Sequence, residues 1–383
     1  MMKYDLVIAG GGAAGLAAAA SFIGKMNHEA GVCILEKNDA PGRKINATGG
    51  GRCNLTNEAC PGKGTTLEFF KGLGIETWHD SEGRYYPYTN KASDVTKALV
   101  DAVSAGAEIR CGFTVKVISR IRPDDGEDGY FMITGTDSDG KMEMIFADCV
   151  LIAMGGKAGP QYGTTGDGYT IARTLGHTVT TVFPILTGIE CRAEGVDFAS
   201  LKGVRAKGTV ILNKDGKAIV RDTGEIQFTE DGISGICVFN LTPHIRADRW
   251  ESFEDALKRF TVTVDLAPDF TAEELAARES VFGILTEKLA AVFEGADAAA
   301  IKNWQLDVTG VKGWRDAQAT YGGVALDEID METMESRLVP GLYFAGEIID
   351  AQGPCGGFNL QNAWETGLKA AHAAANSMKK GDE

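Results

Sequence analysis

Three glycines near the start of the chain have the spacing of a dinucleotide-binding turn. Gly10, Gly12 and Gly15 follow an apolar run, and Glu36 ends a second apolar run 21 residues beyond Gly15 (36 − 15). In this G-x-G-x-x-G pattern the glycines allow a tight turn and a close approach of backbone N–H groups to a pyrophosphate, while the acid accepts hydrogen bonds from a ribose. A helix expected after the turn adds positive potential at its N-terminus. A plain glycine turn is the alternative, but strand, helix and acid in register favour an adenine dinucleotide site.

A second glycine-rich loop follows Glu36 closely. Residues 41–57 hold three consecutive glycines, Gly49–Gly51, among cations and small polar residues. Backbone N–H groups of such a loop can reach N5 and O4 of a flavin ring, and Arg43 and Lys44 can neutralise phosphate. A merely flexible loop is the alternative. The position directly after Glu36 favours a cofactor loop.

A strand, an acid, a glycine turn and a helix follow one another again between residues 341 and 371. The expected strand ends at Gly346, Glu347 and Asp350 supply acids, and a helix is expected to begin near Asn359 after the turn at 353–357. These elements return the chain to the dinucleotide domain. A dehydrogenase that binds only NAD has no need of such a C-terminal return. In a flavoprotein the acid can bond the ribityl and pyrophosphate region, and the helix N-terminus can face the flavin N1/C2 carbonyl. The return therefore indicates FAD.

Several further elements must position these motifs. Parallel strands are expected at 4–9 and 32–36, with a helix at 13–26 between them. Ser93 is expected to cap a helix that runs to about Ala105. Strand-like runs that form a β-meander lie at 107–119, 130–135 and 143–152, separated by hairpin turns at 124–126 and 137–140. The run 149–154 also predicts a parallel strand that leads into Gly155 and Gly156, because ligands lie at the carboxyl ends of such strands.

The middle of the chain has a different pattern. Residues 186–240 alternate apolar and polar side chains around a turn at 213–216, which predicts small antiparallel sheets. Residues 252–303 have helical periodicity, with a capping box at 271–274. One apolar helical face is expected to contain Leu275, Phe282, Leu285, Leu289 and Phe293. We interpret this segment as a substrate-side insertion.

The chain resembles a bacterial family of FAD-binding oxidoreductases that includes aminoacetone oxidase-like enzymes and BaiN-type reductases. The resemblance covers nearly the whole chain, and its most specific part is the glycine–arginine–cysteine loop. The matching segments are 42–44, 48–57, 83–84, 90–94, 163–168, 228–229, 232–235, 322–324, 346–347 and 356–361. Two positions depart or vary: Met154 stands where many flavoproteins have threonine, and Cys355 has no general role to transfer.

The resemblance implies an α/β fold with non-covalently bound FAD. A Rossmann-like FAD-binding domain of the glutathione-reductase type is interrupted by a β-barrel-like domain and a helical hairpin domain. The expected boundaries are 1–185 with 325–383 for the FAD-binding domain, 186–245 with 304–324 for the β-rich domain, and 246–303 for the helical domain.

Composition narrows the classes of partner. The 383 residues include 53 acids and 38 bases, and the net charge of −15 argues against a broad nucleic-acid or anionic-membrane surface. Apolar runs stay well short of the roughly 18 residues of a membrane span. The first strand begins almost at once, so we expect no signal peptide and a cytoplasmic protein. The eight cysteines form no C-x-x-C pair, and the histidines (His28, His79, His177, His244, His372) lack ligand spacing, so no metal is expected. The oligomeric state stays open.

The residues expected to bind the cofactor share these loops and strand ends. They are Gly10, Gly12, Ala13, Ala14, Gly15, Glu36, Lys37, Gly42, Arg43, Lys44, Thr48, Gly49, Gly50, Arg52, Cys53, Asn54, Val115, Gly155, Gly156, Gly346, Glu347, Asp350, Gly357, Asn359, Leu360 and Gln361. Arg52, Cys53 and Cys355 are the candidates for a catalytic role, although structural thiols and a phosphate-directed arginine are alternatives. Tyr85, Tyr86 and Tyr162 are weaker candidates to line a substrate cavity.

Three functions are compatible with these motifs. The favoured hypothesis is an FAD-dependent oxidoreductase that reduces an activated C=C or C=O bond of a small molecule, with NAD(P)H as a transient electron donor. An oxidase of a small amine that produces hydrogen peroxide is the second. A non-catalytic flavin-binding regulator is the third. An RNA-modifying flavoenzyme is a further alternative by fold, against which the net charge counts.

Overall fold

The computed structural model describes residues 3–27, 30–122, 129–248 and 251–381. It divides the chain into two compact units, of which the first comprises Met1–Phe183 with Ala319–Glu383 and the second Pro184–Gln318. The expected hairpin turn at 124–126 and His28 lie outside the described residues. The chain thus leaves the first unit and returns to it.

The first unit consists of a large sheet, a small sheet and six helices among its described residues. Its helices are α1 (Ala13–Lys25), α2 (Arg43–Ala47), α3 (Lys63–Gly72), α4 (Ala92–Ser104), α5 (Asp167–Thr174) and α12 (Phe358–Gly381). Its strands are β1 (Lys3–Ala9), β2 (Val32–Glu36), β3 (Thr56–Asn57), β4 (Thr77–His79), β5 (Arg84–Pro87), β6 (Glu108–Cys111), β7 (Thr114–Ile121), β8 (Tyr130–Thr136), β9 (Met142–Ile152), β17 (Ala319–Tyr321) and β18 (Leu342–Phe344). Short 3₁₀ turns are η1 (Thr48–Gly51), η2 (Pro160–Tyr162), η4 (Leu326–Glu328) and η5 (Gly346–Ile348). The strand β10 (Phe183–Ile185) spans the boundary between the units.

The large sheet has the strand order β6-β2-β1-β9-β8-β7, with β18 also paired to β9. The pairs β6–β2, β2–β1, β1–β9 and β9–β18 are parallel, whereas β9–β8 and β8–β7 are antiparallel. The central strands are almost wholly buried, which explains their continuous apolar runs. The meander strand expected at 143–152 and the parallel strand expected at 149–154 are one element, β9. Its first half pairs with β8 and its second half pairs with β1. The expected α/β fold with a parallel sheet is confirmed.

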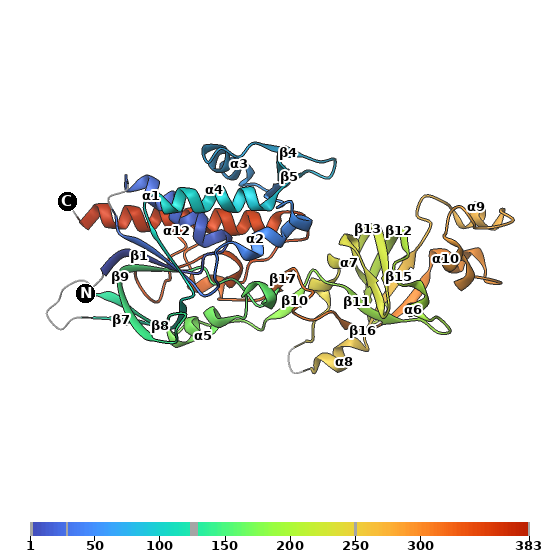
Figure 1. Ribbon diagram of the computed structural model, residues 1–383. Coiled ribbons are helices and arrows are strands. Elements are labelled where there is room, and N and C mark those ends of the chain that lie inside the picture. The colour runs from blue at the N-terminus through green and yellow to red at the C-terminus, as the bar shows by residue number, and fades with distance from the viewer. Residues whose placement is uncertain (1–2, 28–29, 123–128, 249–250, 382–383) are drawn as a thin grey trace. The chain divides into compact units, whose positions relative to one another are not determined.

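Helices α1, α4 and α12 lie along one side of the large sheet, to which β7 and β8 belong, and α5 lies below the sheet in the view of Figure 1. Helices α1 and α12 pack backbone to backbone, because a Cβ at Gly367 would lie 2.5 Å from the carbonyl oxygen of Ala14. Trp364 of α12 is fully buried, donates Nε1–H to the Leu55 carbonyl at 3.0 Å, and meets the Phe70 ring edge-on at 5.0 Å. These contacts fasten α12 to the loop that precedes β3.

The second unit is built on a closed barrel with the strand order β11-β14-β13-β12-β15-β16. Its strands are β11 (Ile189–Arg192), β12 (Arg205–Lys214), β13 (Lys217–Thr229), β14 (Gly232–Ser234), β15 (Phe260–Asp265) and β16 (Trp304–Val311). Its helices are α6 (Phe198–Leu201), α7 (Ile236–Phe239), α8 (Phe253–Leu257), α9 (Ala272–Ala276), α10 (Glu287–Val292) and α11 (Ala298–Lys302), with the 3₁₀ turn η3 (Thr242–His244). Phe198, Phe228 and Trp304 stack in its core. The barrel confirms the expected β-rich insertion.

Three local expectations need correction. Residues 260–265 lie within the segment expected to be helical but form β15, because Val262 and Val264 alternate with threonines and fit a half-buried strand. Phe282 is 74% exposed and does not share a buried face with Leu285. Helix α4 begins at Ala92 with Lys91 at the N-cap, so Ser93 lies inside its first turn. The capping box at Thr271 is confirmed.

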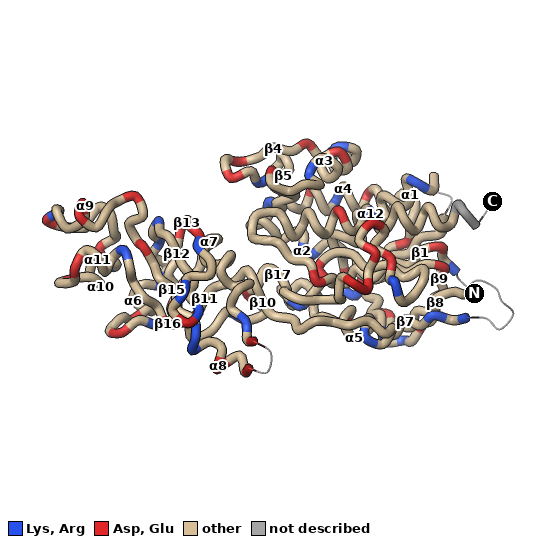
Figure 2. Tube along the Cα trace, turned by 180° about the vertical axis from the view of Figure 1, so that it is seen from behind, with Lys and Arg blue, Asp and Glu red and all other residues tan. Residues whose placement is uncertain are grey.

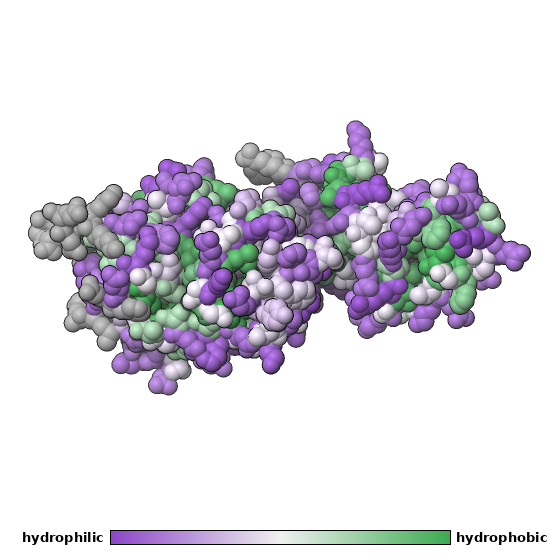
Figure 3. Space-filling view, turned by 90° about the horizontal axis from the view of Figure 1, so that it is seen from above, coloured by the Kyte–Doolittle hydropathy of each residue, from purple (hydrophilic) through white to green (hydrophobic). Residues whose placement is uncertain are grey.

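Charged residues of both signs are interspersed along the traces of both units (Figure 2). On the face that Figure 3 presents, hydrophobic residues form small groups among hydrophilic ones. Within the described ranges, no helix is both long and apolar enough to cross a bilayer, and no cluster of three His, Cys, Asp or Glu side chains could hold a metal ion.

A buried histidine makes the stability of the first unit sensitive to acid. His177 is 3% exposed, and its Nε2 lies 2.7 Å from the Ser336 hydroxyl, while Nδ1 has no hydrogen-bond partner among the described residues. The Ser336 oxygen already accepts N–H bonds from Leu338 and Val339, so its hydroxyl donates to a neutral imidazole. Burial lowers the pKa of His177 below its ordinary value.

We expect this histidine to destabilise the protein as the pH falls through the ordinary pKa of about 6.5, because the unfolded chain then binds a proton that the folded chain rejects. His177→Gln, which can still accept from Ser336, should flatten the loss of unfolding free energy between pH 7.5 and pH 5.5. Urea titrations at these pH values measure it. His79→Gln, at an exposed position, is the control. A variant with the parental pH slope would contradict the assignment.

Candidate functional site

The first glycine turn is a cradle that tolerates no side chain at two of its positions. Gly10 has φ +109°, and a Cβ there would overlap the carbonyl oxygen of Ala153 on the neighbouring strand end. A Cβ at Gly15 would overlap the carbonyl oxygen of Gly10 itself. The turn is held in place because Gly10 N–H donates to the Leu35 carbonyl at 2.9 Å. Glycine is thus required by the close packing of β1, α1 and β9.

Gly12 differs from its neighbours because it faces open space. A Cβ at Gly12 would meet no atom within 4 Å, and the residue is the N-cap of α1 without a side-chain cap. The first N–H groups of a helix have no acceptor within it, and here Ala13 and Ala14 occupy those positions. This end of α1 can receive a pyrophosphate.

Glu36 lies beside the cradle at the end of β2. It is 7% exposed, and one carboxylate oxygen accepts from Gly11 N–H at 2.8 Å. The other oxygen accepts from the backbone N–H of Asn38 at 2.8 Å and from its side-chain amide at 2.6 Å. Val115, on β7, is buried. Two residues before it, the Phe113 N–H donates to the Glu36 carbonyl at 2.9 Å. The carboxylate is thus oriented next to the glycine turn.

The start of the second glycine loop contacts the cradle directly. Gly42, at φ +73°, donates its N–H to the Gly11 carbonyl at 2.8 Å. Lys44, on α2, pairs with Glu347 at 2.6 Å, which joins this loop to the C-terminal return of the chain. Arg43 lies 3.6 Å from Asp39, and Lys37 pairs with Asp167 at 2.6 Å. Three of the predicted cations, Lys37, Arg43 and Lys44, are therefore each paired with a carboxylate.

The end of β9 completes this side of the site. A Cβ at Gly156 would overlap the Thr320 hydroxyl and come within 2.8 Å of Glu347. Glu347 also accepts from the Thr320 N–H at 2.8 Å. A Cβ at Gly346 would lie 3.0 Å from that of Ala14 on α1. Asp350, in contrast, accepts from the Thr180 hydroxyl at 2.9 Å rather than from a cation of the cradle.

The turn before α12 lies against the other end of the second glycine loop. Gly357, at φ +103°, would bring a Cβ within 2.6 Å of the Thr56 carbonyl and 2.8 Å of the Asn54 side-chain oxygen. Asn57 donates its side-chain amide to the Gly356 carbonyl at 3.0 Å. Asn359, beside Leu360 in the first turn of α12, exchanges two 3.0 Å bonds with Gly353. The loop and the turn are therefore one connected structure.

Several buried polar atoms in this region, the Thr56 hydroxyl among them, have no hydrogen-bond partner within the described ranges. The side-chain oxygens of Asn54 and Gln361, in residues 8% and 4% exposed, lack a hydrogen-bond partner among the described residues. Buried acceptors are normally satisfied, so such atoms indicate a missing ligand. A flavin ring presents N–H groups, and a helix N-terminus favours its reduced, negatively charged form. Together with the cradle at the other end of the loop, these residues fit FAD.

The glycines of η1 and Cys53 share a left-handed backbone. Gly49, Gly50 and Gly51 have φ of +57°, +64° and +85°, and Cys53 has φ +61° although it is not glycine. Cys53 is fully buried and its N–H donates to the Thr48 carbonyl at 3.0 Å. The glycines adopt this conformation without strain, whereas at Cys53 it is held only by well-packed surroundings, and such strain is frequent at functional sites.

The thiols proposed as catalytic candidates are poor nucleophiles in this structure. Burial raises the pKa of Cys53 to about 12, and burial also raises the pKa of Cys355. Met154, at the position of the frequent threonine, packs against Gly168 on α5. None of these side chains presents a thiolate or a hydroxyl near neutral pH.

We therefore expect slow alkylation of Cys53 in the native protein. With iodoacetamide at pH 7.5, Cys111, which is exposed, should be modified first, and Cys53 should react at least about 100-fold more slowly because the thiolate is the nucleophile. Peptide mass mapping over time measures both rates, and Cys111→Ser removes the fast phase. Fast labelling of Cys53 in folded protein would restore it as a catalytic candidate.

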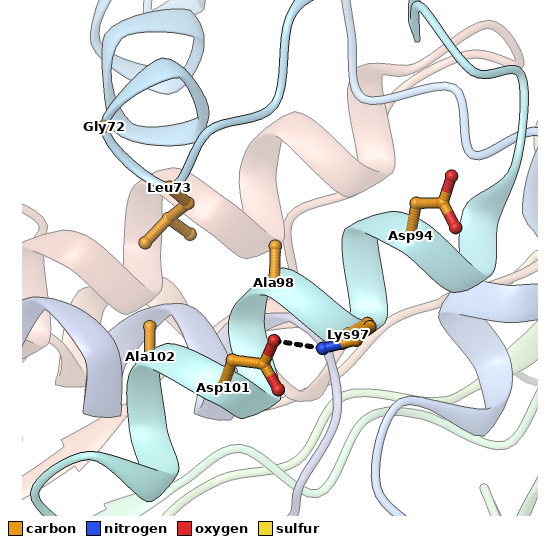
Figure 4. Close-up of a pocket in the computed structure, with 7 residues that line it drawn as sticks. All are labelled: Gly72, Leu73, Asp94, Lys97, Ala98, Asp101 and Ala102. Carbon is orange, nitrogen blue, oxygen red and sulfur yellow. Dashed lines mark hydrogen bonds and ion pairs between the residues drawn. The ribbon is translucent and has the colours of Figure 1, made fainter.

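A separate surface hollow of ≈ 430 Å³ lies between α3 and α4. Figure 4 shows Leu73, Ala98 and Ala102 beside it, with Lys97 paired to Asp101. It contains none of the residues predicted to bind the cofactor. The hollow is not the cofactor site.

Several residues of the site were not predicted from the sequence. Asn38 donates a hydrogen bond to Glu36, and Thr320 donates one to Glu347. The Thr96 side chain occupies the space that a Cβ on Gly42 would need. The small sheet β3-β5-β4 was also missed, although it joins the two loops. Its strands have two to four residues, too few for a periodic signal.

Comparisons with known proteins agree with this geometry. A family model described as "HI0933-like protein Rossmann domain" matches residues 62–373. The chain is 34% identical to the 3-dehydro-bile acid delta(4,6)-reductase of Clostridium scindens, over 96% of this chain and 98% of that protein. It is 26% identical to the ribosomal RNA dihydrouridine synthase of Escherichia coli (97% and 98% covered) and 27% identical to that of Haemophilus influenzae (99% and 100%).

Solved structures with the same fold are more distant in sequence. A 3-ketosteroid delta1-dehydrogenase from Sterolibacterium denitrificans aligns with a TM-score of 0.55 and 13% identity, covering 98% of this chain and 100% of that one. A flavocytochrome c3 fumarate reductase aligns with a TM-score of 0.53 and 15% identity, covering 98% and 78%. At these identities the likeness concerns the fold.

Proposed function

Since the chain belongs to the HI0933-like Rossmann-domain family and is a flavin-dependent oxidoreductase, we propose that it reduces an activated C=C bond of a small organic molecule with electrons from NAD(P)H. The observation that carries this proposal is the continuous site from the cradle to the unpartnered oxygens of Asn54 and Gln361. We assign the cradle to the adenosine and pyrophosphate half of FAD, and the region of Asn54 and Gln361 to its flavin ring. When bound, FAD supplies hydride chemistry at its ring.

The chain's own residues would hold and orient this cofactor. Glu36 would accept hydrogen bonds from the adenosine ribose, and the N-terminus of α1 at Gly12 would receive the pyrophosphate. Lys44, held by Glu347 at 2.6 Å, would place a cation beside the phosphates. Asn54 and the first turn of α12 would accept and donate bonds to the polar edge of the ring.

Reduction of a C=C bond is supported by the names of the relatives. The Clostridium scindens protein is a delta(4,6)-reductase, and the two other relatives form dihydrouridine, whose ring has lost a double bond. A 3-dehydro bile acid has a ketone that is conjugated with its Δ4 and Δ6 double bonds, and the uracil ring has a carbonyl group conjugated with its C=C bond. A C=C bond activated by a carbonyl is therefore the substrate feature that we propose for this chain.

A small molecule is favoured over ribosomal RNA for two reasons. Identity is higher to the bile acid reductase than to the dihydrouridine synthases, 34% against 26% and 27%. The net charge is −15, which opposes binding to a polyanion. We therefore do not propose ribosomal RNA as the substrate, but the experiment below includes it as an alternative.

Anaerobic absorption spectroscopy of the purified protein tests the proposal. We expect flavin bands that bleach on addition of NADH or NADPH and return when a conjugated enone, such as a 3-keto-Δ4 steroid, is added, with the saturated product found by mass spectrometry. Rapid return with oxygen and peroxide, after reduction by an amine without NAD(P)H, would instead identify an oxidase. Return only with uridine-containing ribosomal RNA would identify the RNA enzyme.

A further inference from the structure

Arg52, at the end of the second glycine loop, is a cation for which the described part of the chain supplies no counter-ion. The other two cations of this loop, Arg43 and Lys44, lie within 3.6 Å and 2.6 Å of carboxylates. For Arg52, no carboxylate oxygen of the described residues lies within 4.0 Å, and the one hydrogen bond that its guanidinium makes with them joins Nε to the Gly49 carbonyl at 3.3 Å. The two terminal nitrogens of its guanidinium keep their donors available.

An aromatic platform holds this guanidinium. Its central carbon lies 4.5 Å from the centroid of the Tyr86 ring, and the Tyr86 ring in turn meets Trp78 at 5.6 Å. Tyr86 is 2% exposed, and a Cβ on Gly49 would touch its ring at 3.5 Å, so the platform is packed from below by the glycine loop. Stacking on the ring orients the charge while leaving its edge exposed.

The backbone is anchored directly after Arg52. The three preceding glycines and the following Cys53 are all left-handed, and Cys53 is fully buried in that conformation. Glycine adopts a positive φ without strain, whereas cysteine holds it only where its packing fixes it. The packing of Cys53 therefore fixes the chain on one side of Arg52.

Arg52 and the cradle lie at opposite ends of the second glycine loop. Gly42 bonds Gly11 of the cradle, whereas Arg52, separated from Gly42 by α2 and η1, packs on β5. β5 pairs with β3, and Asn57 of β3 donates to the Gly356 carbonyl in the turn before α12. Arg52 therefore stands on the sheet that joins the two loops proposed to enclose the flavin ring, away from the residues proposed for the pyrophosphate.

Building on the proposed function, we propose that Arg52 binds the carbonyl or carboxylate oxygen conjugated to the reacting C=C bond, and that Tyr86 is the residue that positions it. Guanidinium donors form short, charge-assisted bonds to such oxygens. When a hydride that originates from NAD(P)H adds to the β-carbon, the electron pair of the C=C bond shifts toward that oxygen, and negative charge stays there until a proton from water adds to the α-carbon. A fixed cation stabilises this charge without rearrangement. The substrate class is then an α,β-unsaturated ketone or acid, and an isolated alkene is excluded.

Binding of an unsaturated acid to the oxidised holoprotein tests this proposal without turnover. Calorimetry with cinnamate should show saturable binding that weakens at least about tenfold in Arg52→Gln, with FAD content unchanged. Tyr86→Phe, which keeps the ring, should stay within about threefold of the parent, whereas Tyr86→Leu should approach Arg52→Gln. Arg278→Gln removes a similar arginine from the Phe270 ring in the second unit, 5.1 Å away, and should change nothing.

The outcomes separate this proposal from the proposed function. Loss of flavin absorbance in Arg52→Gln would mean that Arg52 serves the cofactor, which overturns the substrate role and leaves the reductase proposal intact. Absence of cinnamate binding to the parent, or equal affinities for Tyr86→Phe and Tyr86→Leu, would also overturn it. Conversely, the expected pattern of affinities in a protein that reduces no enone would uphold Arg52 and refute the reductase.

Discussion

Gly15→Ala is expected to destabilise the protein by about 3 kcal/mol and to yield chains that retain no flavin. A single added Cβ would overlap the Gly10 carbonyl oxygen and lie 3.2 Å from a methyl of Ile8, both in the closely packed seam between α1 and β1. Neither neighbour can withdraw, because β1 is buried between β2 and β9. Overpacking of this kind costs about 1–3 kcal/mol or more. Guanidinium unfolding of the protein, with and without FAD, measures the change.

Gly12→Ala adds the same methyl group three residues earlier and should behave in the opposite way. Its Cβ would meet no atom within 4 Å, and its φ of −86° suits alanine. The free energy of unfolding of the apoprotein should therefore change by less than about 1 kcal/mol, which is the effect expected of a weaker N-cap residue. The methyl would project into the space proposed for the pyrophosphate, and FAD affinity should fall at least about tenfold. Parental FAD affinity in Gly12→Ala would refute the assignment of the cradle to the pyrophosphate.

Those parts of the site that depend on short-range geometry were predictable. Gly10, Gly15 and Glu36 are specified by a strand, a turn and a helix within 36 residues, and the pattern of each is visible locally. The C-terminal return was predictable for the same reason, since a strand end and a glycine turn lie close to the start of α12. Local steric requirements restrict which residue types can occupy these positions, so the sequence pattern reveals them.

Contacts between distant segments were not predictable in this way. Thr320 bonds the backbone of Lys157 and Ala158 across more than 160 positions, and any small hydroxyl residue would have looked the same in the sequence. The platform of Tyr86 and Trp78 depends on pairing between β4 and β5, whose few residues have no period to detect. Residues of β15 were assigned to a helix because the helical segments on both sides dominated the pattern. Tertiary pairing decides such cases.

Glu36→Ala is expected to raise the dissociation constant for FAD about 100-fold. The carboxylate orients three donors, the N–H of Gly11 and both the backbone and side-chain N–H groups of Asn38, and we propose that it also accepts from the adenosine ribose. A charge-assisted hydrogen bond contributes about 1.5–3 kcal/mol, and every 1.4 kcal/mol changes affinity tenfold. Recovery of flavin fluorescence on dissociation measures the constant. Glu143→Gln, which removes a 2.6 Å partner from Arg110 elsewhere in the large sheet, is the control for a lost carboxylate.

FMN provides a sharper control for Glu36, because it has the flavin ring and one phosphate but lacks the adenosine half. If Glu36 contacts the ribose of adenosine, Glu36→Ala should weaken FAD binding while leaving the weaker binding of FMN within about twofold. An equal loss for both flavins would mean that the substitution collapses the cradle through Gly11 rather than removing a ribose contact. Glu36→Asp distinguishes reach from charge: it keeps the charge but draws the carboxylate back by one methylene, so its FAD affinity should fall nearly as far as that of Glu36→Ala. Since the 2.8 Å bond to Gly11 already places the carboxylate at the turn, we expect reach to be decisive.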